Sequence, residues 1–142
     1  MPSSRLARFA RLPASDRRLL AEALGMLVVA SLAIALLPFR RSILFGARRR
    51  RGPMSGDSSA AGRIGWAIGR AATALPWSAR CFPQGIAAQR MLRRRGIEAR
   101  LHYGIGRAPD EALAAHVWVT ADDAVVVGGQ TDMVFEPVAA YP

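Results

Sequence analysis

Residues 81–106 read CFPQGIAAQRMLRRRGIEARLHYGIG, and residues 114–129 read AAHVWVTADDAVVVGG. Small and apolar residues recur along the first stretch at spacings of four, three and four: Cys81, Gly85, Ala88 and Leu92. This spacing predicts a helix that begins at Cys81, and its small residues let another element approach closely. The arginines of the helix fall mostly on its more polar side: Arg90, Arg93, Arg94 and Arg95. Gly96 suits the position after its last turn.

Beyond Gly96, short apolar runs alternate with polar loops, which is a strand pattern. The runs predict an antiparallel β-meander with strands at residues 97–106, 114–120 and 125–129. The predicted fold class is therefore α+β, with helices followed by a small sheet.

Alternation along the middle strand places two sets of side chains on opposite faces: His116, Trp118 and Thr120 on one, Val117 and Val119 on the other. A turn centred on Asp122 and Asp123 would lead into the returning strand. That register would place Gly129 opposite His116.

Cys81 is the only cysteine of the chain, and its position suits a nucleophile. A helix N-terminus lowers the pKa of a thiol from its usual ~8.5, and a nearby imidazole can take its proton. His116, on a neighbouring strand, is the candidate base. Taken alone, each residue also fits a structural role, because a free cysteine behaves as a small buried hydrophobe. For His102 we expect a structural or surface role.

A Cys–His pair usually has a third group, Asp or Asn, that fixes the imidazole tautomer. On the returning strand this group belongs at position 128 or 129, and both residues are glycine. The nearest candidates are Gln130 and Asp132.

Composition limits the class of protein. With 142 residues, 51% of them apolar, the chain can form one small domain with an appendage. One cysteine excludes an intramolecular disulfide, and one Cys with two His is too few for a convincing zinc site. The single cysteine fits a reducing compartment, so we expect a cytoplasmic protein.

Charge is distributed unevenly along the chain, whose formal net charge is +10. Residues 1–100 carry 19 Arg and four acids, whereas residues 101–142 carry one Arg and six acids. A basic N-terminal part can bind nucleic acid, anionic lipid or an acidic peptide, and charge alone does not choose among them.

Residues 16–37 predict a long apolar helix, with Ser15 as N-cap and Pro38 at its end. Residues 1–14 are expected to be frayed. The uncharged part, residues 23–37, is shorter than the ~20 residues that a bilayer requires. We therefore expect a buried or partner-packed helix, with a membrane-associated helix as the alternative.

Residues 48–62 contain a four-Arg run followed by Gly, Pro, Ser and Asp without periodicity, which is typical of a linker. A short helix is predicted at residues 64–75. The predicted organisation is an N-terminal helical region at 1–47, a linker at 48–62 and a core at 63–142.

These stretches resemble the peptidase half of the lasso-peptide biosynthesis B proteins, within the transglutaminase-like, papain-related superfamily. That signature reads C-x-P-x-(A/G)-x-A-x-Q-x-L-L-R-R-x-G-x-x-A-x-L, then A-H-A-W-V. The matching residues are Cys81, Pro83, Gln89, Leu92, Arg93, Arg94, Gly96, Ala99, Leu101, His116, Trp118 and Val119. Segments 37–41 (LPFRR) and 75–77 (LPW) also resemble the family's N-terminal helices, so the resemblance covers most of the chain.

The resemblance implies a leader peptidase with a transglutaminase-like core, which cuts a ribosomally made precursor between leader and core peptide. Cys81 would be the nucleophile, and His116 the base and later the acid. The family's Asp falls near Gly128. Asp132 is the candidate third member if the strand carries a bulge, and otherwise the pair works as a dyad.

The resemblance also implies partners. The first 80 residues are predicted to be helices and linker, so the chain resembles the split form, in which a separate protein recognises the leader. An ATP-dependent macrolactam cyclase then closes the ring. We expect no cofactor or metal on this chain, and neither nucleic acid nor membrane as its partner.

There are three alternatives. The runner-up enzyme is a transglutaminase-like acyltransferase, which would use the same Cys–His pair but pass the acyl group to an amine. The other two belong to different classes. A non-catalytic basic module would hold phosphate backbones through residues 48–51 and 93–95, with salt-dependent binding that is indifferent to Cys81→Ala. A membrane-tethered protein would be anchored by residues 19–37.

Overall fold

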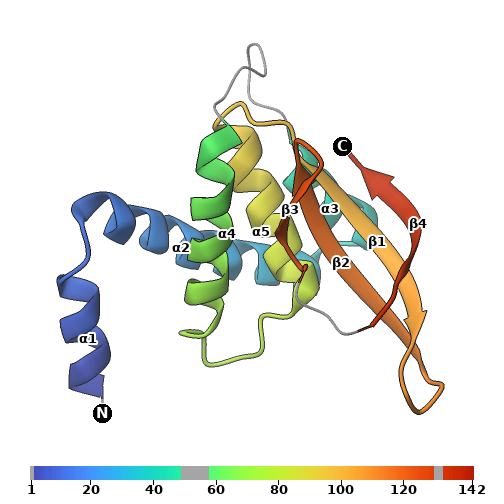
Figure 1. Ribbon diagram of the computed structural model, residues 1–142, viewed down its shortest axis with the longest axis horizontal. Coiled ribbons are helices and arrows are strands. Elements are labelled where there is room, and N and C mark those ends of the chain that lie inside the picture. The colour runs from blue at the N-terminus through green and yellow to red at the C-terminus, as the bar shows by residue number, and fades with distance from the viewer. Residues whose placement is uncertain (1, 49–57, 130–132) are drawn as a thin grey trace.

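Five α-helices and a four-stranded antiparallel sheet make up residues 2–48, 58–129 and 133–142, the part of the chain that the computed structural model describes (Figure 1). In chain order the elements are α1 (Pro2–Ala10), α2 (Ala14–Leu36), α3 (Phe39–Ala47), the 3-10 turn η1 (Ser58–Ala60), α4 (Ala61–Ala72), α5 (Cys81–Arg94), β1 (Arg100–Arg107), β2 (Leu113–Ala121), β3 (Ala124–Val127) and β4 (Glu136–Tyr141). The predicted α+β class is confirmed. Most of the predicted linker lies outside the described residues, and the division into three parts stays a prediction.

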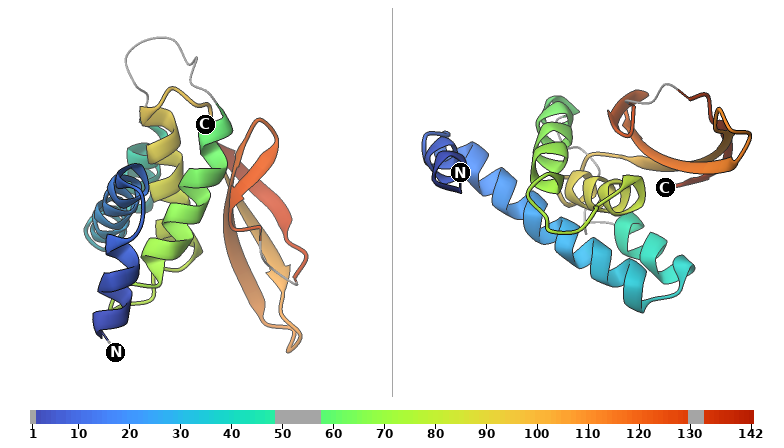
Figure 2. Two further views of the ribbon diagram at one scale, coloured as in Figure 1. Left: turned by 60° about the vertical axis from the view of Figure 1, so that its left-hand side comes forward. Right: turned by 90° about the horizontal axis from the view of Figure 1, so that it is seen from below.

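Helix α5 packs against the sheet on one side and against α2, α3 and α4 on the others, and α4 also packs directly on β3 (Figure 2). Helix α5 begins at Cys81, as predicted, and Gly96 after it has a positive φ of 72°, as a glycine C-cap requires. A Cβ atom built on Gly85 would lie 2.7 Å from Cγ1 of Val117. Because α5 and β2 approach this closely, the position of Cys81 relative to β2 is fixed by packing.

One hydrophobic core joins α2, α4, α5 and the sheet. Its large, fully buried apolar side chains are Leu27, Ile64, Ile68, Ile86, Met91, Leu92, Leu101 and Val119. The N-terminal helix α2 therefore shares its core with the elements that carry Cys81 and His116.

The sheet has the strand order β3-β2-β1-β4, so β1, β2 and β3 form the predicted meander. Asp122 and Asp123 both have positive φ (48° and 61°), as a tight two-residue hairpin turn requires. Val117 and Val119 are buried toward the core, and His116 lies on the other face of β2, as alternation predicts.

The register of β3 differs from the prediction. Pairing runs Thr120↔Val125 and then Val119↔Val127, because β3 carries a bulge. A Cβ on Gly128 would therefore lie against Trp118, and the prediction that Gly129 lies opposite His116 is wrong.

Strand β4 was not predicted from the sequence. It pairs with β1 at the second edge of the sheet, with Leu101 opposite Tyr141. Its sequence EPVAAY contains Pro137, which an edge strand tolerates but which removes the strand signal.

Two predictions at the N-terminus are wrong. Residues 2–10 form α1 rather than a frayed segment, since Arg, Ala and Leu are strong helix formers. Helix α2 begins at Ala14, and Pro13 precedes it in an extended conformation, so Ser15 is not the N-cap. Pro38 follows the end of α2, as predicted.

Helix α2 is long and apolar enough to cross a membrane by length and composition. Its inner face nevertheless belongs to the core, where Ala23, Leu27 and Ala30 are fully buried. Its outer face is exposed.

Arg93 is buried, contrary to the prediction that it lies on the more polar side of its helix. Its guanidinium donates to the carbonyls of Ala47 (3.0 Å) and Ala99 (3.3 Å). One turn earlier, Gln89 donates to the carbonyls of Ala99 (3.4 Å) and Tyr141 (3.1 Å). These two side chains hold α3, β1 and β4 against α5.

Candidate functional site

Cys81 occupies the first position of α5 and is partly exposed. Two contacts hold this turn in place. Phe82 stacks on Phe39 of α3, with ring centroids 5.4 Å apart, and Gln84 donates from Nε2 to the carbonyl of Ala79 at 2.7 Å. The sulfur is thus held at a helix N-terminus, where the main-chain N–H groups of the first turn point toward it.

The ring of His116 is held at one nitrogen by the main chain. Its Nε2 lies 2.6 Å from the carbonyl oxygen of Gly128. Because a carbonyl oxygen can only accept a hydrogen bond, Nε2 carries the proton in the neutral ring. The other nitrogen, Nδ1, then carries a lone pair and has no hydrogen-bond partner among the described residues.

Two aromatic rings restrict the orientation of the imidazole. Phe135 stacks on His116 with centroids 4.9 Å apart and planes 29° apart. Trp118 stacks at 6.1 Å and 20°. These contacts limit rotation of the ring about its side-chain bonds.

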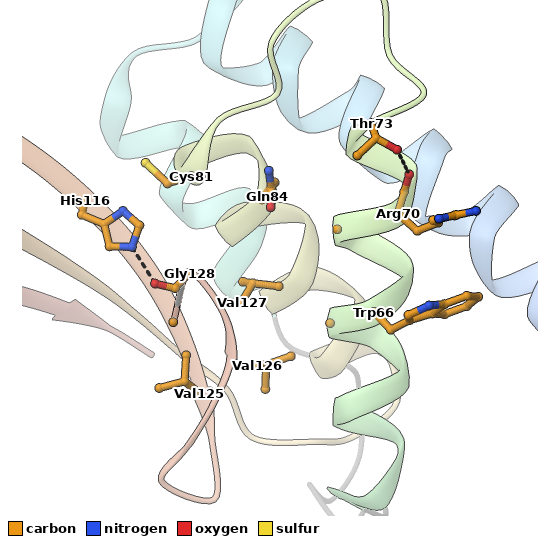
Figure 3. A pocket seen from close by; sticks show the side chains of 13 residues that line it. Trp66, Arg70, Thr73, Cys81, Gln84, His116, Val125, Val126, Val127 and Gly128 are labelled. Atoms are coloured by element: carbon orange, nitrogen blue, oxygen red, sulfur yellow. Dashed lines mark hydrogen bonds between the residues drawn. The ribbon is translucent and has the colours of Figure 1, made fainter. Parts of the chain in front are cut away.

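A cavity of about 770 Å³ lies between α4, the start of α5 and residues 125–129 (Figure 3). Its lining residues are Gly65, Trp66, Gly69, Arg70, Thr73, Cys81, Gln84, His116, Val125, Val126, Val127, Gly128 and Gly129. Cys81 and His116 both line it, and Figure 3 shows Nδ1 on the side of the ring that faces Cys81. Within the described residues no hydrogen bond joins Sγ to the ring, and such contacts often tighten only when substrate binds.

The wall of the cavity opposite the sheet comes from α4, and sequence reasoning missed it. Trp66 and Arg70 lie on this helix, with side chains that point away from Cys81 (Figure 3). Gly69 also lines the cavity, and a Cβ built on it would meet no heavy atom within 4 Å. At Gly65, one helical turn earlier, a Cβ would lie 2.3 Å from the carbonyl oxygen of Val126, so this glycine is the signal that could have indicated a close approach of α4 to β3.

Two other residues of the site were also missed. Gln84 follows Cys81 by one helical turn, a spacing that places it at the same helix end. Gly128 has no side chain to mark it in the sequence, although its carbonyl oxygen contacts Nε2 of His116.

Asp132 and Gln130 lie outside the described residues, so the role predicted for Asp132 stays a prediction. His102 does not line the cavity. Its Nε2 lies 2.8 Å from Oγ1 of Thr120, and its pKa is lowered, first by burial and then by the nearby Arg100. Among residues 2–48, 58–129 and 133–142, no group of three or more His, Cys, Asp or Glu side chains could hold a metal ion.

Residues 24–140 match the model of a protein family described as the transglutaminase-like superfamily. No curated protein and no solved structure is significantly similar to the chain. The matched range begins within α2 and ends within β4, so it includes the cavity and both of its reactive side chains.

Proposed function

The chain belongs to the transglutaminase-like superfamily, and we propose that it is a cysteine peptidase that removes the leader from a lasso-peptide precursor. Superfamily members are commonly cysteine peptidases or acyltransferases. The observation that carries the proposal is the presence of Cys81 and His116 in one cavity, with Nδ1 of His116 as the free acceptor. The lasso-peptide assignment rests on the resemblance of the Cys81–Leu101 and Ala115–Val119 segments to the B proteins of that pathway.

The first chemical step forms a thioester. Nδ1 of His116 takes the proton of Cys81, and the sulfur attacks the carbonyl carbon of the bond between leader and core. The C–N bond breaks, and His116 gives the proton to the leaving amine of the core peptide. The leader remains attached to Cys81 through its terminal carbonyl.

The second step releases the leader. His116 takes a proton from a water molecule, whose oxygen attacks the thioester carbonyl. The C–S bond breaks, the thiol of Cys81 regains a proton, and the leader leaves as a carboxylic acid. An amine in place of this water would give the acyltransferase reaction.

The first turn of α5 supplies the electrostatic part of the site. The N–H groups of Cys81 and Phe82 have no acceptor within the helix, so they can donate to the oxyanion that forms during each attack. Gln84 fixes the same turn through its bond to Ala79.

We also propose that a separate leader-recognition protein docks on the outer face of α2. Its large exposed side chains are Leu24, Val29, Leu32 and Leu36, with 38, 45, 54 and 77% of their surface accessible. Arg17 and Arg18 lie at one end of this apolar stripe, and Arg40 and Arg41 lie just beyond the other. The surface fits a partner with an apolar patch and acidic residues at its rim.

The test is cleavage of a candidate lasso-peptide precursor, with a candidate recognition protein present, followed by mass spectrometry. Wild-type protein should produce a single cut that yields a free core peptide. Cys81→Ala and His116→Asn should each lower the rate by about a thousandfold or more. Circular dichroism of both variants shows whether the fold is intact.

The products separate the competing functions. A leader with a free carboxyl terminus supports the peptidase. An acyltransferase would join the leader to an added amine, such as hydroxylamine, and would not hydrolyse the precursor when no amine is added. A cut that persists in folded Cys81→Ala would overturn the proposal.

A further inference from the structure

We propose that the main-chain carbonyl of Gly128 orients His116, in the place where a triad uses a side-chain carboxylate or amide. The inference rests on the proposed role of His116 as the base. It assigns Gly128 as a positioning residue, which acts on the reaction through the imidazole.

The contact itself has the geometry of a strong hydrogen bond. Nε2 of His116 and the carbonyl oxygen of Gly128 are 2.6 Å apart, shorter than the usual N–H···O distance of about 2.9 Å. The bond fixes the tautomer with the proton on Nε2. The lone pair of Nδ1 then points to the Cys81 side of the cavity (Figure 3).

The backbone at Gly128 accounts for the position of this carbonyl. Gly128 has a φ of +83°, in the left-handed region that favours glycine. A Cβ at this residue would lie 2.5 Å from the carbonyl oxygen of Val117 and 2.8 Å from Cβ of Trp118. Any other residue would have to move the chain, and the carbonyl would move with it.

Two glycines of β1 leave room for the rings that stack on His116. A Cβ on Gly104 would lie 2.8 Å from the Trp118 ring, and a Cβ on Gly106 would lie 3.0 Å from the Phe135 ring. Both rings can therefore lie close over the strand. The imidazole is restrained by one carbonyl and two aromatic rings, and no carboxylate of the described residues is bonded to it.

The tautomer can be measured directly by long-range ¹H–¹⁵N correlation spectra of the ¹⁵N-labelled protein. The chain has two histidines, so a His102→Gln variant assigns the signals. We expect neutral His116 to be protonated on Nε2. A His116 that is protonated on Nδ1 in the wild type would overturn the proposal.

Two substitutions distinguish the Gly128 carbonyl from the Asp132 carboxylate as the orienting group. Asp132→Ala should leave neutral His116 protonated on Nε2. If Asp132 were the orienting group, its loss would give a mixture of His116 tautomers, and that result would contradict the proposal.

Gly128→Ala should give a mixture of His116 tautomers and lower the cleavage rate by about tenfold or more, while far-UV circular dichroism stays that of the wild type. An unchanged Nε2–H tautomer in folded Gly128→Ala would contradict the proposal. If Gly128→Ala does not fold, the His116 tautomers of the wild type and of Asp132→Ala decide the question. These spectra need no substrate, so they remain decisive even if the precursor is not cleaved and the proposed function fails.

Discussion

At the scale of single residues, the absence of a side chain at Gly69 gives the cavity its width on the α4 side. Gly69 lines the same cavity as Cys81, and the space where its Cβ would lie is open. In the proposed peptidase, a substrate peptide would occupy this space when its carbonyl lies at the sulfur.

We predict that Gly69→Leu lowers kcat/KM for precursor cleavage by about tenfold or more, because a 1 Å displacement of a substrate already costs about a hundredfold. Stability should be unchanged or raised, since Leu is a better helix former than Gly by about 0.8 kcal/mol. Steady-state kinetics and thermal unfolding check both parts.

Gly62→Leu is the matched control, since Gly62 lies on the same helix, is open to solvent and does not line the cavity. It should keep wild-type kinetics. Equal activity of Gly69→Leu and Gly62→Leu would show that the substrate does not occupy this part of the cavity.

The sequence allowed Cys81 and His116 to be chosen because thiol and imidazole are rare here and reactive by type. Gly128 could not be found in this way, because a carbonyl belongs to every residue and its direction depends on a left-handed turn after a bulge. Trp66 and Arg70 line the cavity because α4 packs beside β3. In the local pattern of α4, a glycine at position 65 is a weak signal for that packing, because glycine also occurs in helices for other reasons.

At the scale of elements, the close approach of α5 to β2 holds the two reactive side chains in register. Gly85 has no room for a side chain, since its Cβ would contact Val117. By contrast, a Cβ built on Gly25 of α2 would meet no heavy atom within 4 Å. The two glycines allow the same substitution to be compared in opposite surroundings.

We predict that Gly85→Ala destabilises the protein by about 1–3 kcal/mol through overpacking, and that Gly25→Ala stabilises it by about 1 kcal/mol through helix propensity. Urea unfolding measures both free energies. Equal changes of the same sign would contradict the packing described for α5 and β2.

Helix α2 is tied to α5 by a bidentate ion pair. Arg95 donates to both carboxylate oxygens of Glu22, at 2.9 and 2.6 Å. The hydrogen bond from Arg95 holds the pKa of Glu22 below its usual value, and partial burial opposes this effect. Since the folded pKa is the lower one, the pair stabilises the fold above the unfolded pKa, and this contribution is lost as the pH falls.

We predict that Glu22→Gln lowers the free energy of unfolding by about 1 kcal/mol at pH 7. The destabilisation caused by Glu22→Gln should become smaller as the pH falls below about 4.5, the pKa of Glu22 in the unfolded chain. It should disappear as the pH falls through the lower pKa of Glu22 in the folded protein. Urea unfolding at a series of pH values measures this. Glu98→Gln, at an exposed site, is the control and should change the free energy of unfolding little. If the destabilisation by Glu22→Gln does not depend on pH, the ion-pair explanation is contradicted.

The helix start at Cys81, the Asp122–Asp123 turn and the three-strand meander could be predicted because each has a local signal. Strand β4 could not be predicted, because it contains proline and pairs with a strand that is distant in the sequence. The bulge of β3 could not be predicted either, because it depends on how β3 packs against α4. The burial of Arg93 is likewise a tertiary effect, since its partners are carbonyls of α3 and of the residue before β1.

At the scale of the whole molecule, the outer face of α2 lies on the side of the helices away from the sheet (Figure 2). Leu32 and Leu36 are exposed at 54% and 77%, and the proposed partner would cover them. The same surface would serve an anionic membrane, which is the alternative that the test has to separate.

We predict that the double variant Leu32→Asn with Leu36→Asn weakens binding of the recognition protein by about tenfold or more. The reason is that Asn side chains bury less apolar area against the partner than the two leucines do. The fold should be unaffected because neither residue is in the core. Isothermal titration with the purified partner measures the affinity. Unchanged affinity, together with loss of binding to vesicles that contain anionic lipid, would assign this face to a membrane instead.

In the proposed mechanism, Cys81 attacks the leader's terminal carbonyl with the help of His116. The decisive probe is a leader peptide that ends in a vinyl sulfone at the cleavage position, with intact-protein and tandem mass spectrometry as the readout. We predict one equivalent of probe attached to Cys81, with a labelling rate that falls by about tenfold or more in His116→Asn. Cleavage of the precursor without labelling of Cys81, or labelling at the same rate in folded His116→Asn, would rule out this mechanism.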